Sequence, residues 1–320
     1  FTKTANAAAT VEQILSLERA WCDIVRFSVP DEESAKSISY IKEHTHIPLV
    51  ADIHFNYKLA LAALERGIDK IRINPGNIGS PERIKAVADA CRMRGVPIRI
   101  GVNGGSLEKH ILAKYGSPTP EALCESALYH VRLLEQFDFT DIVVSIKSSD
   151  VADTVRANRL FAEKTDYPLH LGVTEAGTER MGIIKSSAGI GSLLLDGIGD
   201  TIRVSLTDEV EKEVAAARDL LKALGLRGGV NIVSCPTCAR TNIDVIGLAT
   251  RLHALLDDCE KNIKVAVMGC AVNGPGEAKD ADIGIAGGLG EAILIKHGEI
   301  VGKIPEDRVI ETLMAEIEKL

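Results

Sequence analysis

Three cysteines in the last third of the chain have the spacing of ligands for a metal centre. Cys235 and Cys238 form a C-x-x-C motif directly after the apolar segment 229–233, and Cys270 follows a second apolar segment, 264–269. A C-x-x-C on the turn that ends a strand allows two thiolates to face one centre, and a neighbouring strand end adds a third. Iron–sulfur clusters are held by thiolates, some of which other ligands replace. The pattern therefore favours a cluster whose fourth ligand is not cysteine.

Two other interpretations of these cysteines remain open. A redox-active C-x-x-C is expected to open a helix, which Pro236 and the segment 240–242 leave uncertain. A structural zinc site normally has four Cys or His ligands, and no second C-x-x-C or paired His lies near Cys270. Glu277 follows the tight turn 274–276, which can bring its carboxylate close to a cluster, although a solvated glutamate explains this residue equally well.

Cations lie inside several otherwise apolar segments that we predict to be strands. A single strand cation normally lies at a solvated edge, because burying an unpaired cation costs several kcal/mol. Residues i and i+2 of a strand share a face, which adds polar side chains beside the cations. Such a group predicts a polyanion site, and diphosphate fits the fork geometry of arginine. The cations are Arg26, Arg72, Arg99, Lys147 and Arg203, and their polar neighbours are Asn74, Asn103 and Ser205.

Three further polar residues fall at the ends of the same predicted strands. Asp52 and His54 lie in the sequence Ala-Asp-Ile-His, and Glu175 lies in Val-Thr-Glu-Ala-Gly. A carboxylate beside arginines orients them as readily as it takes part in chemistry. We treat all three as candidate catalytic residues.

The elements that would position these residues alternate between strand and helix along the chain. Nearly continuous apolar strands that alternate with amphipathic helices predict an α/β fold with a parallel sheet. We expect a (β/α)8 TIM-type barrel whose first strand precedes Phe1, with a doubly wound open sheet as the second choice. The seven predicted strands are 23–29, 48–55, 70–76, 97–103, 141–148, 169–175 and 201–206.

A junction near residue 228 is predicted to divide the chain into two domains. Residues 1–228 would form the substrate-binding barrel, and residues 229–320 a small α+β domain that carries the cluster. The second domain is expected to hold a helix over about 242–259, short strands at 283–286, 291–295 and 299–303, and a final helix from Pro305. Its glycines do not follow the dinucleotide-binding pattern.

Composition excludes several classes of protein. The 320-residue chain has a formal net charge of −8, which argues against general nucleic-acid binding. No apolar segment approaches the length of a membrane span. An odd number of cysteines, 7, indicates a reducing compartment, so we predict a cytoplasmic protein, with a plastid as the second choice. Because the chain begins at Phe1 rather than Met, we expect further residues upstream.

Long motifs along the whole chain resemble the bacterial-type 4-hydroxy-3-methylbut-2-enyl diphosphate synthases of the methylerythritol phosphate route to isoprenoids. The resemblance implies reductive ring opening and dehydration of 2-C-methyl-D-erythritol 2,4-cyclodiphosphate. It also implies the short form, since the large insertion of the plant-type enzymes is absent. The motifs are SCPTCAR, GCAVNGPGEA, VADIHF, RINPGNIG, IRIGVNGGSLE, GVTEAG and GIGDTIRVSL.

The resemblance also assigns cofactor, partners and site residues. It implies a [4Fe–4S] cluster with Cys235, Cys238, Cys270 and Glu277 as ligands, and flavodoxin or ferredoxin as electron donor. It implies a head-to-tail homodimer in which one chain's cluster domain covers the barrel of the other. It matches Asp52, His54 and Glu175 to the substrate pocket. It assigns substrate contacts to the predicted strand cations and their polar neighbours, which are Arg26, Arg72, Asn74, Arg99, Asn103, Lys147, Arg203 and Ser205.

Two other functional classes are compatible with parts of this pattern. A barrel phosphate-ester lyase or hydrolase with a structural metal site would be colourless and stable in air. An electron carrier or metal-storage protein would explain the cysteines but not the strand cations. The visible spectrum of anaerobically purified protein separates these classes from the synthase.

Overall fold

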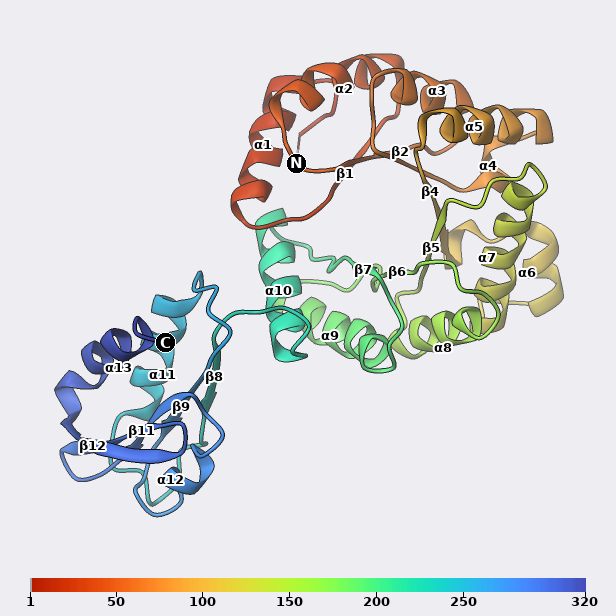
Figure 1. The fold of residues 1–320 in the computed structure, drawn as a ribbon. Helices are drawn as coiled ribbons and strands as arrows, with labels where there is room; N and C mark the ends of the chain where they lie inside the picture. The colour runs from red at the N-terminus through yellow and green to blue at the C-terminus, as the bar shows by residue number, and fades with distance from the viewer. Residues whose placement is uncertain (1) are drawn as a thin grey trace. The chain divides into compact units, whose positions relative to one another are not determined.

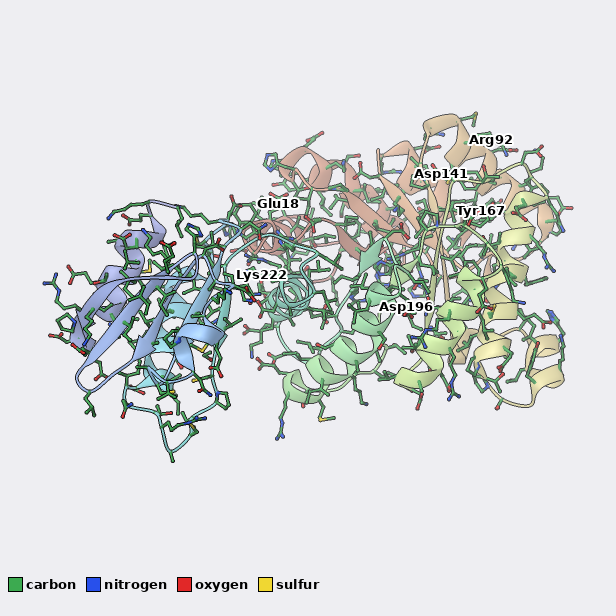
Figure 2. All side chains as sticks on the ribbon, turned by 60° about the horizontal axis from the view of Figure 1, so that its bottom comes forward. Glu18, Arg92, Asp141, Tyr167, Asp196 and Lys222 are labelled. Carbon is green, nitrogen blue, oxygen red and sulfur yellow. The ribbon has the colours of Figure 1, made fainter. Side chains whose placement is uncertain are left out.

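The computed structural model describes residues 2–320, and the chain separates into two compact units. The first unit ends at Leu220 and the second begins at Leu221. This division falls within helix α10 (Val210–Ala223), before the junction that the sequence predicted after residue 228. Lys222 already belongs to the second unit, in which its Nζ donates to the carbonyl oxygen of Asp257 at 3.1 Å (Figure 2).

The strands of the first unit are parallel and follow chain order. One sheet has the order β1-β2-β3-β4-β5, and β6 pairs with β7. A single parallel bridge between Val144 and Leu169 connects the two groups. A doubly wound sheet reverses its strand order, so that second choice was wrong. The strands are β1 (Val25–Ser28), β2 (Leu49–Asp52), β3 (Lys70–Ile73), β4 (Ile98–Asn103), β5 (Ile142–Lys147), β6 (His170–Leu171) and β7 (Thr201–Ile202).

Helices form the outer ring of the first unit and enclose the strands (Figure 1). No strand precedes α1 among residues 2–24, and β7 and β1 are not paired in the described part of the chain. The helical elements are α1 (Ala7–Arg19), α2 (Glu32–His44), α3 (Tyr57–Glu65), α4 (Pro75–Ile78), α5 (Pro81–Arg94), η1 (Gly104–Ser106), α6 (Lys109–Tyr115), α7 (Pro120–Glu135), α8 (Val151–Ala162), α9 (Glu179–Leu195) and α10.

The predicted sixth strand, 169–175, is much longer than the observed β6. The β6 ladder ends at Leu171, and beyond it Glu175 and Gly177 adopt left-handed backbone conformations, with φ angles of 53° and 103°. This backbone does not support strand pairing, and a non-glycine residue adopts it only rarely.

Polar contacts at other loops join neighbouring strand–helix segments. The Glu18 carboxylate accepts the backbone N–H of His46 at 2.7 Å, and Asp196 pairs with Arg159 at 2.7 Å (Figure 2).

The second unit is a mixed five-stranded sheet with order β12-β11-β10-β9-β8. Strands β8, β9 and β10 are parallel, and β11 and β12 continue the sheet in antiparallel fashion. Its elements are β8 (Asn231–Ser234), α11 (Val245–Leu256), β9 (Lys264–Met268), α12 (Gly274–Glu277), β10 (Ile283–Gly287), β11 (Glu291–Lys296), β12 (Glu299–Pro305), η2 (Glu306–Arg308) and α13 (Val309–Ile317).

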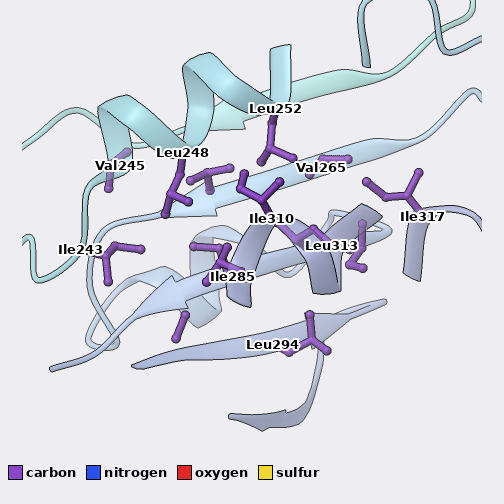
Figure 3. Packing of buried hydrophobic residues seen from close by; sticks show 14 of the residues in the cluster. Ile243, Val245, Leu248, Leu252, Val265, Ile285, Leu294, Ile310, Leu313 and Ile317 are labelled. Carbon is purple, nitrogen blue, oxygen red and sulfur yellow. The ribbon is translucent and has the colours of Figure 1, made fainter. Parts of the chain in front are cut away.

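The main core of the second unit lies between its sheet and helices α11 and α13. Leu252 of α11 and Leu313 of α13 are fully buried and meet Val265 and Ile285 of the central strands (Figure 3). A smaller cluster of mostly short side chains contains Ala266, Ala286 and, at its margin, Cys235. The second cluster lies beside the loop that begins at Cys235.

No helix in the described residues is long and apolar enough to cross a membrane.

Candidate active site

The predicted strand cations lie on one face of the first unit's sheet. In the β2–β3–β4 register Asp52 is opposite Arg72, and Arg72 is opposite Arg99. Paired residues on adjacent strands lie about 5 Å apart and project to the same side. Buried isoleucines, such as Ile71 and Ile73 of β3, alternate with these polar residues. We call Arg26, Arg72, Arg99, Lys147 and Arg203 the cation cluster.

Two carboxylates pair with three members of the cation cluster. Buried Asp52 lies 2.9 Å from Arg72 Nη1 and 3.7 Å from Arg26 Nη1. Glu213 of α10 lies 3.5 Å from Arg203 Nη2. Asp52 therefore orients two guanidinium groups at once, which is the structural role that the sequence left open for it.

Arg99 and Lys147 have no ion-pair partner within residues 2–320, and burial lowers the pKa of each. Arg99 is only 6% exposed, and its Nε has no hydrogen-bond partner within residues 2–320. Burial, followed by repulsion from Arg26 and Arg72, lowers the pKa of Arg99 to about 9. Burial also holds the pKa of Lys147 well below its ordinary value, with Arg203 as the next largest cause. An anion bound here would relieve both effects.

His170 of β6 lies beside the cation cluster, and the sequence analysis did not include it. Its ring is buried; Nδ1 lies 2.9 Å from Thr201 Oγ1, and Nε2 has no partner in the described chain. Burial, and then the charge of Lys147, hold the pKa of His170 well below its ordinary value, so the ring is neutral. The available signal was the period-2 pattern of the strand, which places His170 and Gly172 on one face.

The three predicted polar neighbours of the cations have different environments. Asn74 is 3% exposed, and neither polar atom of its carboxamide has a partner in the described residues. Asn103 uses its side-chain oxygen locally, because Oδ1 accepts the N–H of Gly105 at 3.0 Å. Ser205 lies three residues after β7 and is half-buried. Asn74 is thus the member whose carboxamide is buried with both polar atoms free.

His54 and Glu175 lie in loops that follow β2 and β6, and both are exposed. The His54 ring is 6.2 Å from the ring of Phe55. Within residues 2–320 the side chains of His54 and Glu175 form no hydrogen bond or ion pair. Glu175 has the left-handed backbone described above. In the described chain neither His54 nor Glu175 forms a hydrogen bond or ion pair with the cation cluster.

Two glycines provide the space that the cations occupy. A Cβ atom on Gly101 would lie 2.4 Å from Arg72 Nε, and one on Gly172 would lie 2.7 Å from Lys147 Nζ. Arg72 also donates to the carbonyl oxygen of Gly101 at 3.3 Å. These positions need a residue without a side chain, because the cationic groups lie directly over the backbone.

Gly101→Ala is expected to displace Arg72 from Asp52 and to weaken the binding of inorganic pyrophosphate about tenfold, since a charge-assisted contact contributes about 1.5–3 kcal/mol. Calorimetry with the free protein measures this effect. Gly302→Ala is the matched control, because Gly302 also lies in a strand and a Cβ there would meet no atom. Unchanged affinity of Gly101→Ala would contradict the packing role.

All three candidate cluster cysteines are free thiols at the carboxyl ends of β8 and β9. The N–H of Gly269 donates to Cys235 Sγ at 3.1 Å. Hydrogen bonds from the backbone and side chain of Arg240 lower the pKa of Cys238. The N–H groups of Asn273, Val272 and Gly274 lower the pKa of Cys270.

These N–H groups stabilise thiolates, the form in which cysteine binds metals. The donor set thus fits an iron–sulfur cluster. Within the described residues, however, no three Cys, His, Asp or Glu side chains lie close enough together to hold a single metal ion. Glu277 ends the short helix α12 and is exposed. Its role as a fourth ligand stays a prediction.

Two family models match almost the entire chain. The GcpE TIM-barrel domain matches residues 1–218, and the GcpE protein C-terminal domain matches residues 231–319. The chain belongs to the GcpE family.

Curated relatives of this GcpE-family chain extend the match. It is 58% identical to the 4-hydroxy-3-methylbut-2-en-1-yl diphosphate synthase (flavodoxin) of Caldicellulosiruptor saccharolyticus, over 100% of this chain and 92% of that protein. It is 59% identical to the enzyme of the same name from Caldanaerobacter subterraneus subsp. tengcongensis, over 100% and 90%. The corresponding Ruminiclostridium cellulolyticum enzyme is 56% identical, over 100% and 91%.

Membership of the GcpE family confirms two predictions from the sequence. The resemblance to the synthase family is correct, and so is the fold class of an α/β TIM-type barrel followed by a smaller C-terminal domain. The GcpE barrel model spans the seven parallel strands described above.

Proposed function

We propose that this chain converts 2-C-methyl-D-erythritol 2,4-cyclodiphosphate to 4-hydroxy-3-methylbut-2-enyl diphosphate. In the reaction a C–O bond of the ring breaks, an electron pair and protons enter, and a water molecule leaves. The observation that carries the proposal is the cation cluster, in which Arg99 and Lys147 have no ion-pair partner within residues 2–320. It occurs in a chain whose relatives are named as this synthase. A cyclic diphosphate supplies the negative charge that these cations lack.

The cation cluster would bind the two phosphoryl groups, with Arg99 and Lys147 as the members that gain most. Asp52 would hold Arg72 and Arg26 in fixed orientations for this contact. The free carboxamide of Asn74 and the polar groups of Asn103 and Ser205 would complete the substrate contacts. His54 and Glu175 are proposed to deliver protons for the departing water, and their exposed loops would have to close over the substrate.

Cys235, Cys238, Cys270 and Glu277 are the proposed ligands of a [4Fe–4S] cluster. When bound, the cluster supplies electrons to the substrate and a Lewis-acidic iron. Glu277 is proposed as the most exchangeable ligand, because a carboxylate oxygen binds a soft-ligand cluster less firmly than thiolates do. The N–H donors around the sulfurs would stabilise their negative charge and set the reduction potential.

The proposed partners are a reduced flavodoxin and a second copy of this chain. The relatives' names specify flavodoxin as the donor of those enzymes, and ferredoxin is the alternative here. A head-to-tail homodimer would bring the iron–sulfur cluster of one chain to the cation cluster of the other. Seven free thiols support a reducing, cytoplasmic location.

Anaerobic purification followed by a turnover assay tests the proposed function. We expect brown, oxygen-sensitive protein that forms the linear allylic diphosphate from the cyclodiphosphate when given reduced flavodoxin. A colourless, air-stable protein that releases phosphate or cleaves a carbon–carbon bond would instead identify a hydrolase or lyase and would refute the proposal.

Glu277→Ala is expected to alter the Mössbauer signal of one iron in the resting enzyme and to reduce turnover at least tenfold, because the predicted carboxylate ligand is lost. The measurement compares Mössbauer spectra and rates of anaerobic samples. Asp280→Ala removes a nearby exposed carboxylate and serves as the control. If spectra and turnover of Glu277→Ala both match the wild type, Glu277 is only a residue of the turn.

A further inference from the structure

Asn74 occupies the position before helix α4 where asparagine normally caps a helix. An N-cap asparagine uses its side-chain oxygen to accept an N–H from the first turn. Asn74 makes no such bond, and both polar atoms of its buried carboxamide are without partners in the described chain. Its backbone is extended, with φ −111° and ψ 108°, so its side chain lies on the same face of β3 as Arg72.

A histidine from another helix takes the capping role instead. Pro75 has no N–H, so Gly76 carries the first free donor of α4. The Gly76 N–H donates to Nδ1 of His130, a residue of α7, at 3.2 Å. A Cβ on residue 76 would lie 2.7 Å from His130 Cε1, and glycine is therefore required for this approach.

His130 is itself held in one orientation and one tautomer. Its ring is fully buried, and Nε2 lies 2.5 Å from Glu108 Oε1. Because Nδ1 accepts the Gly76 N–H, the ring proton is on Nε2 and faces Glu108. Ser126 Oγ donates to the other oxygen of Glu108 at 2.7 Å. Polar contacts thus connect Gly76, His130, Glu108 and Ser126: His130 accepts the Gly76 N–H, and Glu108 contacts His130 Nε2 and accepts the Ser126 hydroxyl.

We propose that His130 and Glu108 are positioning residues for Asn74: by satisfying the Gly76 N–H, they leave the Asn74 carboxamide free to bind the anionic substrate. The arrangement removes the local competitor for Asn74 Oδ1. Without His130, the side chain of Asn74 is the nearest group that can cap α4, and it would turn away from the cation cluster. This role rests on the proposed function, since Asn74 is there a substrate contact.

A double-mutant cycle between His130 and Asn74 tests the proposal. His130→Ala is expected to raise KM for the cyclodiphosphate about fivefold to tenfold, the effect of one lost hydrogen bond, with kcat within about twofold of wild type. Asn74→Ala should raise KM at least as much. The double variant should be no worse than Asn74→Ala alone, because His130 acts through Asn74. Multiplicative effects of the two substitutions would overturn the proposal.

Glu108 provides a second test that does not require His130→Ala to fold. Glu108→Gln keeps an oxygen that accepts the Nε2 proton and should retain wild-type KM, whereas Glu108→Ala should reproduce the KM of His130→Ala. His110→Ala is the matched control, because it removes an exposed histidine that contacts Tyr129. It should change neither KM nor kcat. Equal losses in Glu108→Gln and Glu108→Ala would contradict the role in holding the His130 tautomer.

Failure of the proposed function would be visible separately. If wild-type protein with its cluster does not turn over the cyclodiphosphate, that function is wrong, and the same cycle is measured on the affinity for inorganic pyrophosphate. Pyrophosphate needs only the cation cluster and Asn74. Non-additive losses of its affinity would still support the positioning role, and additive losses would refute it.

Discussion

Replacing Cys270 with serine is expected to abolish the broad visible absorption of the anaerobically purified protein together with its turnover. Cys270 lies just beyond β9, and three backbone N–H groups converge on its sulfur and lower its pKa. Serine remains protonated at neutral pH and is a poor ligand for iron, so these donors would face no thiolate. Cys235→Ser and Cys238→Ser should give the same result, because each removes one of only three thiolates in the predicted ligand set.

The measurements are iron content per chain, the visible spectrum and turnover under anaerobic conditions. Cys22→Ser is the matched control, because Cys22 is outside the predicted set and a serine hydroxyl can replace its hydrogen bond to the Ile24 carbonyl oxygen. We expect the control to keep both iron and activity. Retention of four irons per chain in all three ligand variants would exclude these cysteines as cluster ligands.

Arg99→Ala and Arg203→Ala are each expected to weaken substrate binding roughly 10- to 100-fold. Removal of one charge-assisted contact costs about 1.5–3 kcal/mol. The effect of Arg99→Ala on the stability of the free protein is expected to be opposite in sign to its effect on substrate binding. Its guanidinium is buried among Arg26 and Arg72, and this environment lowers its pKa to about 9. Relief of that burial and repulsion should leave the melting temperature of Arg99→Ala unchanged or raised, while its affinity falls.

Calorimetric titration of the substrate and thermal unfolding of the free protein measure the two effects. Arg159→Ala removes an exposed arginine that pairs with Asp196 on the outer helices, and it should retain wild-type affinity. Wild-type affinity in both Arg99→Ala and Arg203→Ala would show that the cation cluster does not bind the diphosphate. A large loss of stability in Arg99→Ala would show that Arg99 is compensated within the protein.

The sequence was sufficient for the fold class and for the family. The strand–helix alternation predicted the seven parallel strands, because a period of 2 or 3.6 in apolar residues is a local property of the chain. The same period placed Arg72 with Asn74, and Arg203 with Ser205, on one face. The spacing of Cys235 and Cys238 and the long motifs identified the family, which the comparisons confirm.

The tertiary structure decided which of these groups are already paired and which are free. Asp52 forms ion pairs with Arg26 and Arg72 of neighbouring strands. The side-chain oxygen of Asn103 instead accepts a hydrogen bond within its own turn. His170 joins the cation cluster only because β6 returns beside β5. Each outcome depends on register and backbone conformation, which short-range patterns do not specify.

The most distant case is the cap of α4. Asparagine is a common N-cap residue, and nothing local in the sequence indicates a partner for Gly76 that lies 54 residues further along the chain. Only packing of α7 against this turn brings His130 to the Gly76 N–H and Glu108 to His130. The sequence alone therefore determined which polar and charged residues the strands and turns carry. Which of them remain free for a ligand was determined by contacts between distant segments, because a buried polar group binds whichever partner the fold places beside it.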